Sequence, residues 1–100
     1  MTRPVYLDAA LEDLRDVREH INQENRSAAK RVIASIRNQN TILAEQALIG
    51  RPGRVEGTRE LINSRYPYIT VYRLRDGRVE ILAVIHTSRR WPGSFGGKDV

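Results

Sequence analysis

The chain has 100 residues, of which 40% are hydrophobic and 29% are charged, and its formal net charge is +5 at pH 7. This composition fits one globular domain with a modest core, and it excludes wholesale disorder and a second domain. Because cysteine is absent, disulfides, thiolate metal sites and cysteine nucleophiles are also excluded.

The first half of the chain predicts a short strand followed by a helical hairpin. Residues 4–7 (PVYL) are β-prone, and Asp8 is a good N-cap for a helix that runs to about residue 23. A second helix begins near Asn25 or Ser27 and runs to about residue 48, with a weak point at residues 38–41 (NQNT). The helical spacing of apolar residues predicts a core stripe of Leu11, Leu14, Val17, Val32 and Ile36.

After Gly50, which fits a helix-ending C′ residue, the apolar period changes and three strands are predicted. Residues 58–64, 68–75 and 78–86 are rich in β-branched and aromatic side chains. Asp76-Gly77 is typical of a two-residue type I′ hairpin turn. Counting back from this turn predicts five cross-strand pairs: Arg75–Arg78, Leu74–Val79, Arg73–Glu80, Tyr72–Ile81 and Val71–Leu82.

Together these elements predict an α+β fold with the order β-α-α-β-β-β, in which a helical hairpin packs on a small antiparallel sheet. The helices can cover only one sheet face, yet both faces are largely apolar, so we expect the other face to need a partner. Residues 1–92 form the predicted domain, and residues 93–100 (GSFGGKDV) are interpreted as a flexible tail. Neither a spanning segment nor a signal-peptide h-region is recognisable, which predicts a cytoplasmic protein.

The positive charge is concentrated in the second half of the chain. Residues 1–50 hold seven basic and seven acidic side chains, whereas residues 51–91 hold nine arginines against four acidic residues. Arginine suits bidentate contact with carboxylate or phosphate. This excess favours an anionic partner, which can be nucleic acid or an acidic protein segment.

The glycine- and arginine-rich stretch GRPGRVEGTREL, residues 50–61, is not a phosphate-binding loop. Such loops run from a strand into a helix and end in Lys-Ser/Thr, whereas this one runs from a helix into a strand and has neither residue. Turn chemistry therefore accounts for its glycines and leaves its arginines unexplained.

Catalytic candidates are few, because only two histidines are present. His20 is interpreted as a surface residue, whereas His86 ends the last strand, with arginines on neighbouring strands that could stabilise a phosphate during RNA cleavage by the 2′-hydroxyl. A general base is missing, since Glu60 and Glu80 are the nearest carboxylates and Glu80 is the predicted partner of Arg73. We interpret His86 as structural and leave the nuclease role open. No metal site or cofactor is predicted, because no pair of residues has ligand spacing.

Five motifs in order resemble the RelE/ParE superfamily of toxins from bacterial type II toxin-antitoxin modules, also called plasmid stabilisation proteins. They are DAALEDLRDVREHI, AAKRVIASI, LIGRPGRVEGTREL, YPYITVYRL and ILAVIHTSRRWP, and they span residues 4–92. The resemblance implies a toxin held inactive by a cognate antitoxin, whose acidic, amphipathic C-terminal segment wraps the toxin and whose N-terminal region binds DNA.

The superfamily divides by target, and this chain resembles the ParE-like members that poison DNA gyrase without cutting nucleic acid. No lysine lies between residues 31 and 97, and no tyrosine follows Tyr72, so the usual ribonuclease set is incomplete. The expected protein is therefore not an enzyme; the alternative is a RelE-like mRNA endonuclease acting at the ribosome, and a plain basic binding module remains a third reading. The ribonuclease candidates are Arg59, Arg73, His86 and Arg89. The expected antitoxin- or target-binding residues are Arg51, Arg54, Arg59, Arg65, Arg73, Arg89, Arg90 and Trp91.

Overall fold

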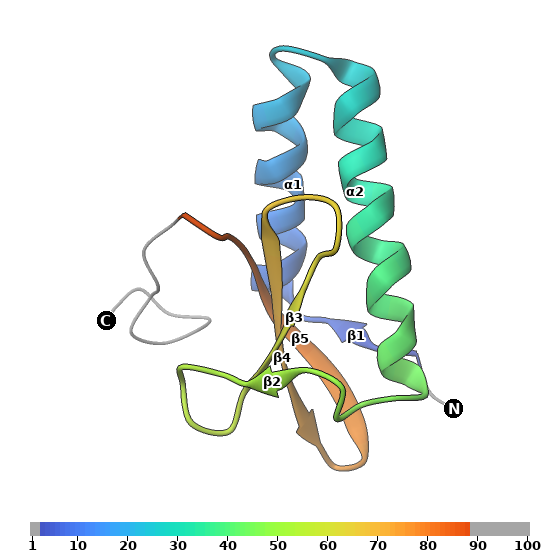
Figure 1. The fold of residues 1–100 in the computed structure, drawn as a ribbon, viewed down its shortest axis with the longest axis vertical. Helices are drawn as coiled ribbons and strands as arrows, with labels where there is room; N and C mark the ends of the chain where they lie inside the picture. The colour runs from blue at the N-terminus through green and yellow to red at the C-terminus, as the bar shows by residue number, and fades with distance from the viewer. Residues whose placement is uncertain (1–2, 89–100) are drawn as a thin grey trace.

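The computed structural model describes residues 3–88, in which two helices pack against a five-stranded sheet (Figure 1). The elements in chain order are β1 (Val5–Tyr6), α1 (Asp8–Asn22), α2 (Arg26–Asn40), the 3-10 helix η1 (Thr41–Ala44), β2 (Arg51–Pro52), β3 (Arg59–Ile62), β4 (Tyr68–Arg75) and β5 (Arg78–His86). The predicted α+β class and the order of the helices and main strands are confirmed. The short strand β2 was not predicted.

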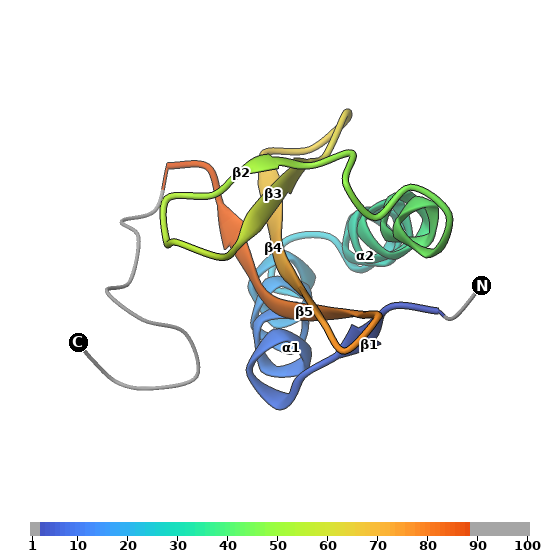
Figure 2. The ribbon, with the colours of Figure 1, turned by 90° about the horizontal axis from the view of Figure 1, so that it is seen from below.

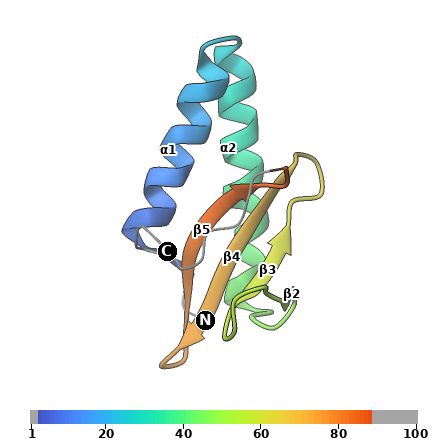
Figure 3. The ribbon, with the colours of Figure 1, turned by 90° about the vertical axis from the view of Figure 1, so that its left-hand side faces the viewer.

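The sheet has the strand order β1-β5-β4-β3-β2. Strands β3 to β5 are antiparallel neighbours, as predicted, and the unpredicted β2 pairs antiparallel with β3. In contrast, β1 runs parallel to β5. The sheet is therefore mixed, because β5 has one parallel and one antiparallel neighbour. Figure 3 shows the hairpin on one side of the sheet, and Figure 1 shows its connecting turn projecting beyond the sheet.

The predicted helix starts are correct, but one of the caps is wrong. Asn25 caps α2, where its Oδ1 accepts a hydrogen bond of 3.0 Å from the Ala28 amide. Leu7 occupies the cap position of α1 without a side-chain hydrogen bond, so Asp8 is the first helical residue instead of the cap. There its carboxylate still interacts favourably with the helix dipole.

Helix α2 ends at Asn40, earlier than predicted, at the weak point NQNT. The Thr41 hydroxyl donates to the Asn38 carbonyl at 2.6 Å, and the chain tightens into η1. Polar side chains that bond nearby backbone groups compete in this way with a continuing helix. Gly50 is consequently not a helix C′ residue. It lies directly before β2.

The hairpin between β4 and β5 forms as predicted up to a bulge. Asp76 and Gly77 have φ values of 54° and 74°, as a type I′ turn requires. The four pairs nearest the turn are confirmed, but Val71 pairs with Ala83 instead of Leu82, because the register shifts between Val71 and Tyr72. The extra residue reverses the faces of all later β5 residues.

The core lies between the sheet and the helices, in two clusters of buried apolar side chains. One cluster contains Ala10, Leu43, Tyr72, Val79 and Ile81, and the other contains Leu14, Val32, Ile36, Tyr68 and Val84. Leu14, Val32 and Ile36 are therefore core residues, as predicted, and Val17 packs against the second cluster. Leu11 is not a core residue, because it is 39% exposed.

The opposite face of the sheet carries a third apolar cluster, formed by Ile69, Val71, Leu82, Ala83 and Ile85, with Leu7 packed against it. Each of the five clustered side chains is less than a tenth exposed. The expectation of an open apolar sheet face is therefore wrong. On this face Ile62, which pairs with Ile69, is 45% exposed. The other exposed large apolar side chains are Leu11, Leu48, Ile49 and Leu74.

Candidate functional site

Four of the predicted binding residues form two groups in the structure. Arg51, Arg54 and Arg59 lie on β2, on the following loop and on β3. Arg65 lies beyond the other end of β3, in the turn toward β4, where it lines a groove against α2. Arg89, Arg90 and Trp91 lie outside the described residues. Figure 2 shows β2 and its loop at the sheet edge farthest from β1.

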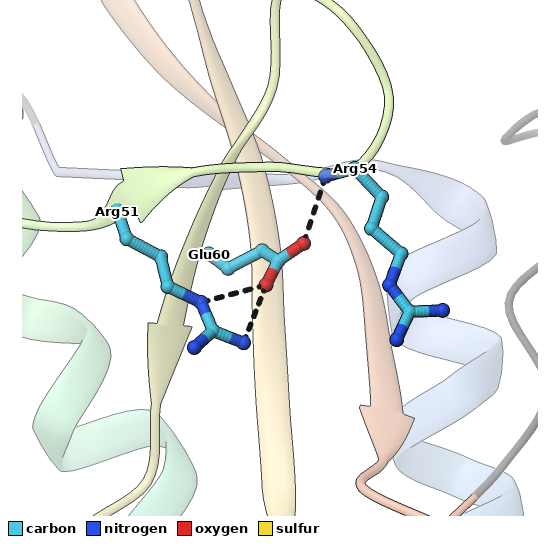
Figure 4. Close-up of polar contacts among 3 residues, drawn as sticks. All are labelled: Arg51, Arg54 and Glu60. Atoms are coloured by element: carbon cyan, nitrogen blue, oxygen red, sulfur yellow. Dashed lines mark hydrogen bonds and ion pairs between the residues drawn. The ribbon is translucent and has the colours of Figure 1, made fainter.

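Glu60 organises the first group, and sequence reasoning considered it only as a possible base. Its side chain is 3% exposed, and its Oε1 accepts a hydrogen bond from Arg51 Nε at 3.0 Å and forms an ion pair with Arg51 Nη2 at 2.9 Å. Its Oε2 accepts from the Arg54 amide at 3.0 Å, while the Arg54 side chain points away from the carboxylate (Figure 4). A buried carboxylate needs such partners, so Glu60 fixes the side chain of Arg51 and the backbone of Arg54.

Arg51 is held in place but remains accessible. Its side chain is 58% exposed, and both of its bonds to Glu60 use one edge of the guanidinium. Ordering the arginine before a ligand arrives reduces the entropy lost on binding. Arg51 can therefore contact an anionic partner with its remaining donors.

Arg59 serves mainly to position the chain that precedes β2. Its Nη1 donates to the carbonyls of Gly50 at 2.7 Å and Leu48 at 3.2 Å. Tyr72, which is fully buried, donates its hydroxyl to the Ala47 carbonyl at 2.7 Å and accepts from the Gly50 amide at 2.9 Å. Burial raises the pKa of Tyr72, against smaller opposite effects of Gly50 and Arg59. The phenol thus stays neutral and keeps its hydrogen bond to the Ala47 carbonyl.

The connection from residue 53 to residue 58 is an ordered turn. The Gly53 amide donates to the Thr58 carbonyl at 2.8 Å, and the Thr58 hydroxyl donates to the Val55 carbonyl at 2.6 Å. Gly57 has a φ of 85°, which glycine adopts without the strain that a side chain would add. The glycines thus shape the turn that presents Arg54.

We call residues 48–58 the arginine loop. Besides Arg51 and Arg54 it carries Leu48, 65% exposed, and Ile49, 46% exposed. Exposed apolar side chains beside ordered arginines are typical of a protein-docking surface. Sequence reasoning missed this apolar part, because the second helix was expected to continue to about residue 48, at the beginning of this loop.

Arg73 is paired as predicted. Its Nε donates to Glu80 Oε1 at 2.8 Å, across β4 and β5. Arg73 lies five residues along β4 from Tyr68, the partner of His86, which corresponds to roughly 17 Å. The structure therefore does not bring Arg73 and His86 together as one phosphate-binding cluster.

His86 lies instead in a groove of about 530 Å³ between α1 and the end of β5. Its Nδ1 accepts from the Ser88 amide at 3.1 Å, and its ring packs edge-on against Tyr68 with 5.2 Å between centroids. The groove is also lined by Asp13, Asp16 and His20. The closeness of these carboxylates to His86 could not be read from the sequence, because α1 meets β5 only in the fold.

Within residues 3–88, no group of three or more histidine, aspartate or glutamate side chains is arranged to hold a metal ion. Nor does any helix in this part of the chain have both the length and the apolar content of a membrane span.

Comparisons with known proteins give a consistent result. Residues 5–91 match the family model described as the ParE toxin of the type II toxin-antitoxin system parDE. The Sinorhizobium fredii protein Y4kP, which is named as a toxin, is 44% identical over 84 residues, covering 83% of this chain and 85% of its own.

Two solved structures share the fold. The chromosomal ParDE toxin-antitoxin system from P. aeruginosa contains a chain with a TM-score of 0.80 and 23% identity, covering 88% of this chain and 98% of that one. The solution structure of the conserved hypothetical protein HP0894 from Helicobacter pylori has a TM-score of 0.55 and 17% identity, covering 88% and 97%.

Proposed function

We propose, from the premise that the chain belongs to the ParE toxin family of type II toxin-antitoxin systems, that its target is DNA gyrase. The arginine loop is the observation that supports this proposal. It combines Arg51, held by the buried Glu60, with the exposed side chains of Leu48 and Ile49. A protein target offers both acidic and apolar groups to such a surface.

The positions of the ribonuclease candidates favour gyrase over mRNA. Arg73 is engaged by Glu80, and Arg59 holds the carbonyls of Leu48 and Gly50. His86 lies far along β5 from Arg73. Cleavage of RNA needs a base, an acid and phosphate-binding cations around one phosphate, and these candidates are dispersed among the described residues.

The same loop supports the proposal of a cognate antitoxin that keeps the protein inactive in the cytoplasm. The P. aeruginosa relative in structure is part of a ParDE toxin-antitoxin system. An acidic, amphipathic antitoxin segment complements arginines beside exposed leucine and isoleucine side chains. Its DNA-binding N-terminal region would remain outside this contact.

A supercoiling assay separates the two targets. With purified gyrase and relaxed plasmid, the purified toxin is expected to inhibit supercoiling at micromolar concentration, and adding the antitoxin is expected to restore it. Primer extension on RNA from cells that express the toxin should then show no new mRNA ends. Uninhibited supercoiling together with new mRNA ends would contradict the gyrase proposal and favour ribosome-dependent cleavage.

Substitution of His86 provides a second test of the same choice. His86→Ala is expected to change toxicity less than about threefold, because the imidazole packs on Tyr68 and lies far from the arginine loop. Toxicity is measured by plating cells after induced expression, with melting temperature as the control for folding. A well-folded His86→Ala variant that has lost all toxicity would restore the nuclease reading.

A further inference from the structure

The two helices carry opposite charge. Helix α1 has five acidic residues, Asp8, Glu12, Asp13, Asp16 and Glu19, against Arg15 and Arg18. Helix α2 has four basic residues, Arg26, Lys30, Arg31 and Arg37, and no acidic residue. Positive charge is thus concentrated on α2 as well as in the second half of the chain.

Arg37, in the last turn of α2, interacts favourably with the helix dipole, but the positive charge at the start of the helix does not serve its stability. Arg26 occupies the first position of the helix, and the first turn has no acidic residue, although the helix dipole favours negative charge there. Arg26 and Lys30 are also like charges four residues apart, a spacing that destabilises a helix. A pattern that opposes helix stability points to a function on the exposed face.

Two grooves border this exposed face. One, of about 540 Å³, lies between α2 and the β3–β4 turn and contains Arg31 and Arg65. The other, of about 680 Å³, lies between α2 and the N-terminal segment and contains Arg3 and Arg37. Asn38 lines both grooves, and no carboxylate lines either one among the described residues.

The arginines of these grooves are available to a ligand. The ion pairs within residues 3–88 involve Arg15, Arg51 and Arg73, and none involves α2. Arg37 is oriented by Tyr6, whose ring centroid lies 4.7 Å from the guanidinium carbon. The β3–β4 turn beside Arg65 is fixed to α2, because Gln39 bonds the Ile62 carbonyl at 2.6 Å and the Ser64 amide at 3.0 Å. The two grooves therefore hold their cations on ordered elements.

We propose that the exposed face of α2, with the two grooves beside it, binds the phosphate backbone of duplex DNA. Arginine, serine, threonine, asparagine and glutamine are the side chains that contact phosphates, and they make up most of both grooves. No exposed large apolar residue belongs to α2, whereas a protein interface has an apolar core. Contact limited to phosphates makes the binding independent of sequence.

The proposal does not depend on gyrase as the target, and its test uses the full chain without gyrase. Fluorescence anisotropy measures binding to a fluorescein-labelled 20-base-pair duplex of arbitrary sequence over a range of salt concentrations. If about four cations neutralise phosphates, the logarithm of the association constant falls with log salt at a slope of about −3.6. The triple variant Arg31→Gln, Arg37→Gln, Arg65→Gln is expected to bind at least tenfold more weakly and to lose about 2.7 from that slope.

The matched control is the triple variant Arg15→Gln, Arg75→Gln, Arg78→Gln, which removes the same charge from exposed positions elsewhere. It is expected to retain wild-type affinity within about threefold. Melting temperatures establish that both variants fold, and the double variant Arg31→Gln, Arg65→Gln keeps the Arg37–Tyr6 contact if the triple variant is unstable. The proposal would be overturned if both triple variants bound the duplex equally weakly, or if the wild type did not bind at low salt. It would also be overturned if polyglutamate displaced the duplex at equal charge concentration.

Discussion

Replacing Leu14 by aspartate is expected to unfold the protein. Leu14 is 5% exposed and packs in one cluster with Val32 and Ile36. Loss of a buried leucine side chain costs about 2–5 kcal/mol, and the unpaired carboxylate adds a desolvation cost. Their sum approaches the roughly 5–15 kcal/mol that stabilises a whole domain. Circular dichroism during thermal and urea denaturation measures the effect.

Leu11→Asp is the matched control, because it places the same residue three positions earlier on the same helix. Leu11 is 39% exposed, so the carboxylate stays in water and the free energy of unfolding should change by about 1 kcal/mol or less. A cooperative unfolding transition of Leu14→Asp at the wild-type midpoint would contradict the assignment of the helix stripe to the core.

Gly50→Ala is expected to lower the free energy of unfolding by roughly 2–5 kcal/mol, through overpacking and a disturbed buried hydrogen bond. An added Cβ would lie 2.6 Å from the Tyr72 hydroxyl oxygen, 2.8 Å from Tyr72 Cε1 and 2.9 Å from the Glu60 carbonyl oxygen. The last atom belongs to the backbone of β3 and cannot rotate away. Chemical denaturation of the variant measures the loss.

A double-mutant cycle with Tyr72→Phe tests the cause of this loss. Tyr72→Phe removes the hydroxyl that bonds Gly50 and Ala47, and it is expected to cost about 1–3 kcal/mol by itself. In that background Gly50→Ala should cost less than in the wild type, because the closest clash is gone. Strictly additive costs would show that the contact with the Tyr72 hydroxyl is not the source of the destabilisation.

The parts of the fold that local chemistry determines could be predicted from the sequence. Asp76-Gly77 specifies its own turn, and the turn sets the register of the pairs that follow it. Asn25 likewise caps α2 through a contact only three residues away. The strand bounds of β4 and β5 were correct for the same reason, because a turn closes one end of each strand.

The parts that depend on contacts distant in sequence could not be predicted. The bulge at Leu82 has no glycine or other local signal, and it reverses the faces of Ala83, Val84 and Ile85. Leu11 continues the helical pattern, yet α1 lies so that Ala10 and Leu14 are buried in its place. The packing of α1 on the sheet decided this.

The candidate site shows the same division. Composition identified the arginines. That Glu60 holds Arg51 and the Arg54 amide became visible only in the structure, where β2 pairs with β3. The partners of Arg59 are backbone carbonyls, which a sequence does not reveal as available acceptors. The basic face of α2 was overlooked because the charge was counted over the first 50 residues, where α1 cancels it.

The most direct measurement of whether the arginine loop carries the target contact is gyrase supercoiling in the presence of loop variants. Wild-type toxin is expected to inhibit supercoiling, and the double variant Arg51→Gln, Arg54→Gln to need at least tenfold more protein for the same inhibition. The control double variant Arg75→Gln, Arg78→Gln, with the same charge change on the exposed β4–β5 hairpin, is expected to inhibit like the wild type. Equal inhibition by wild type and by a well-folded loop variant would contradict the assignment of the contact to this loop.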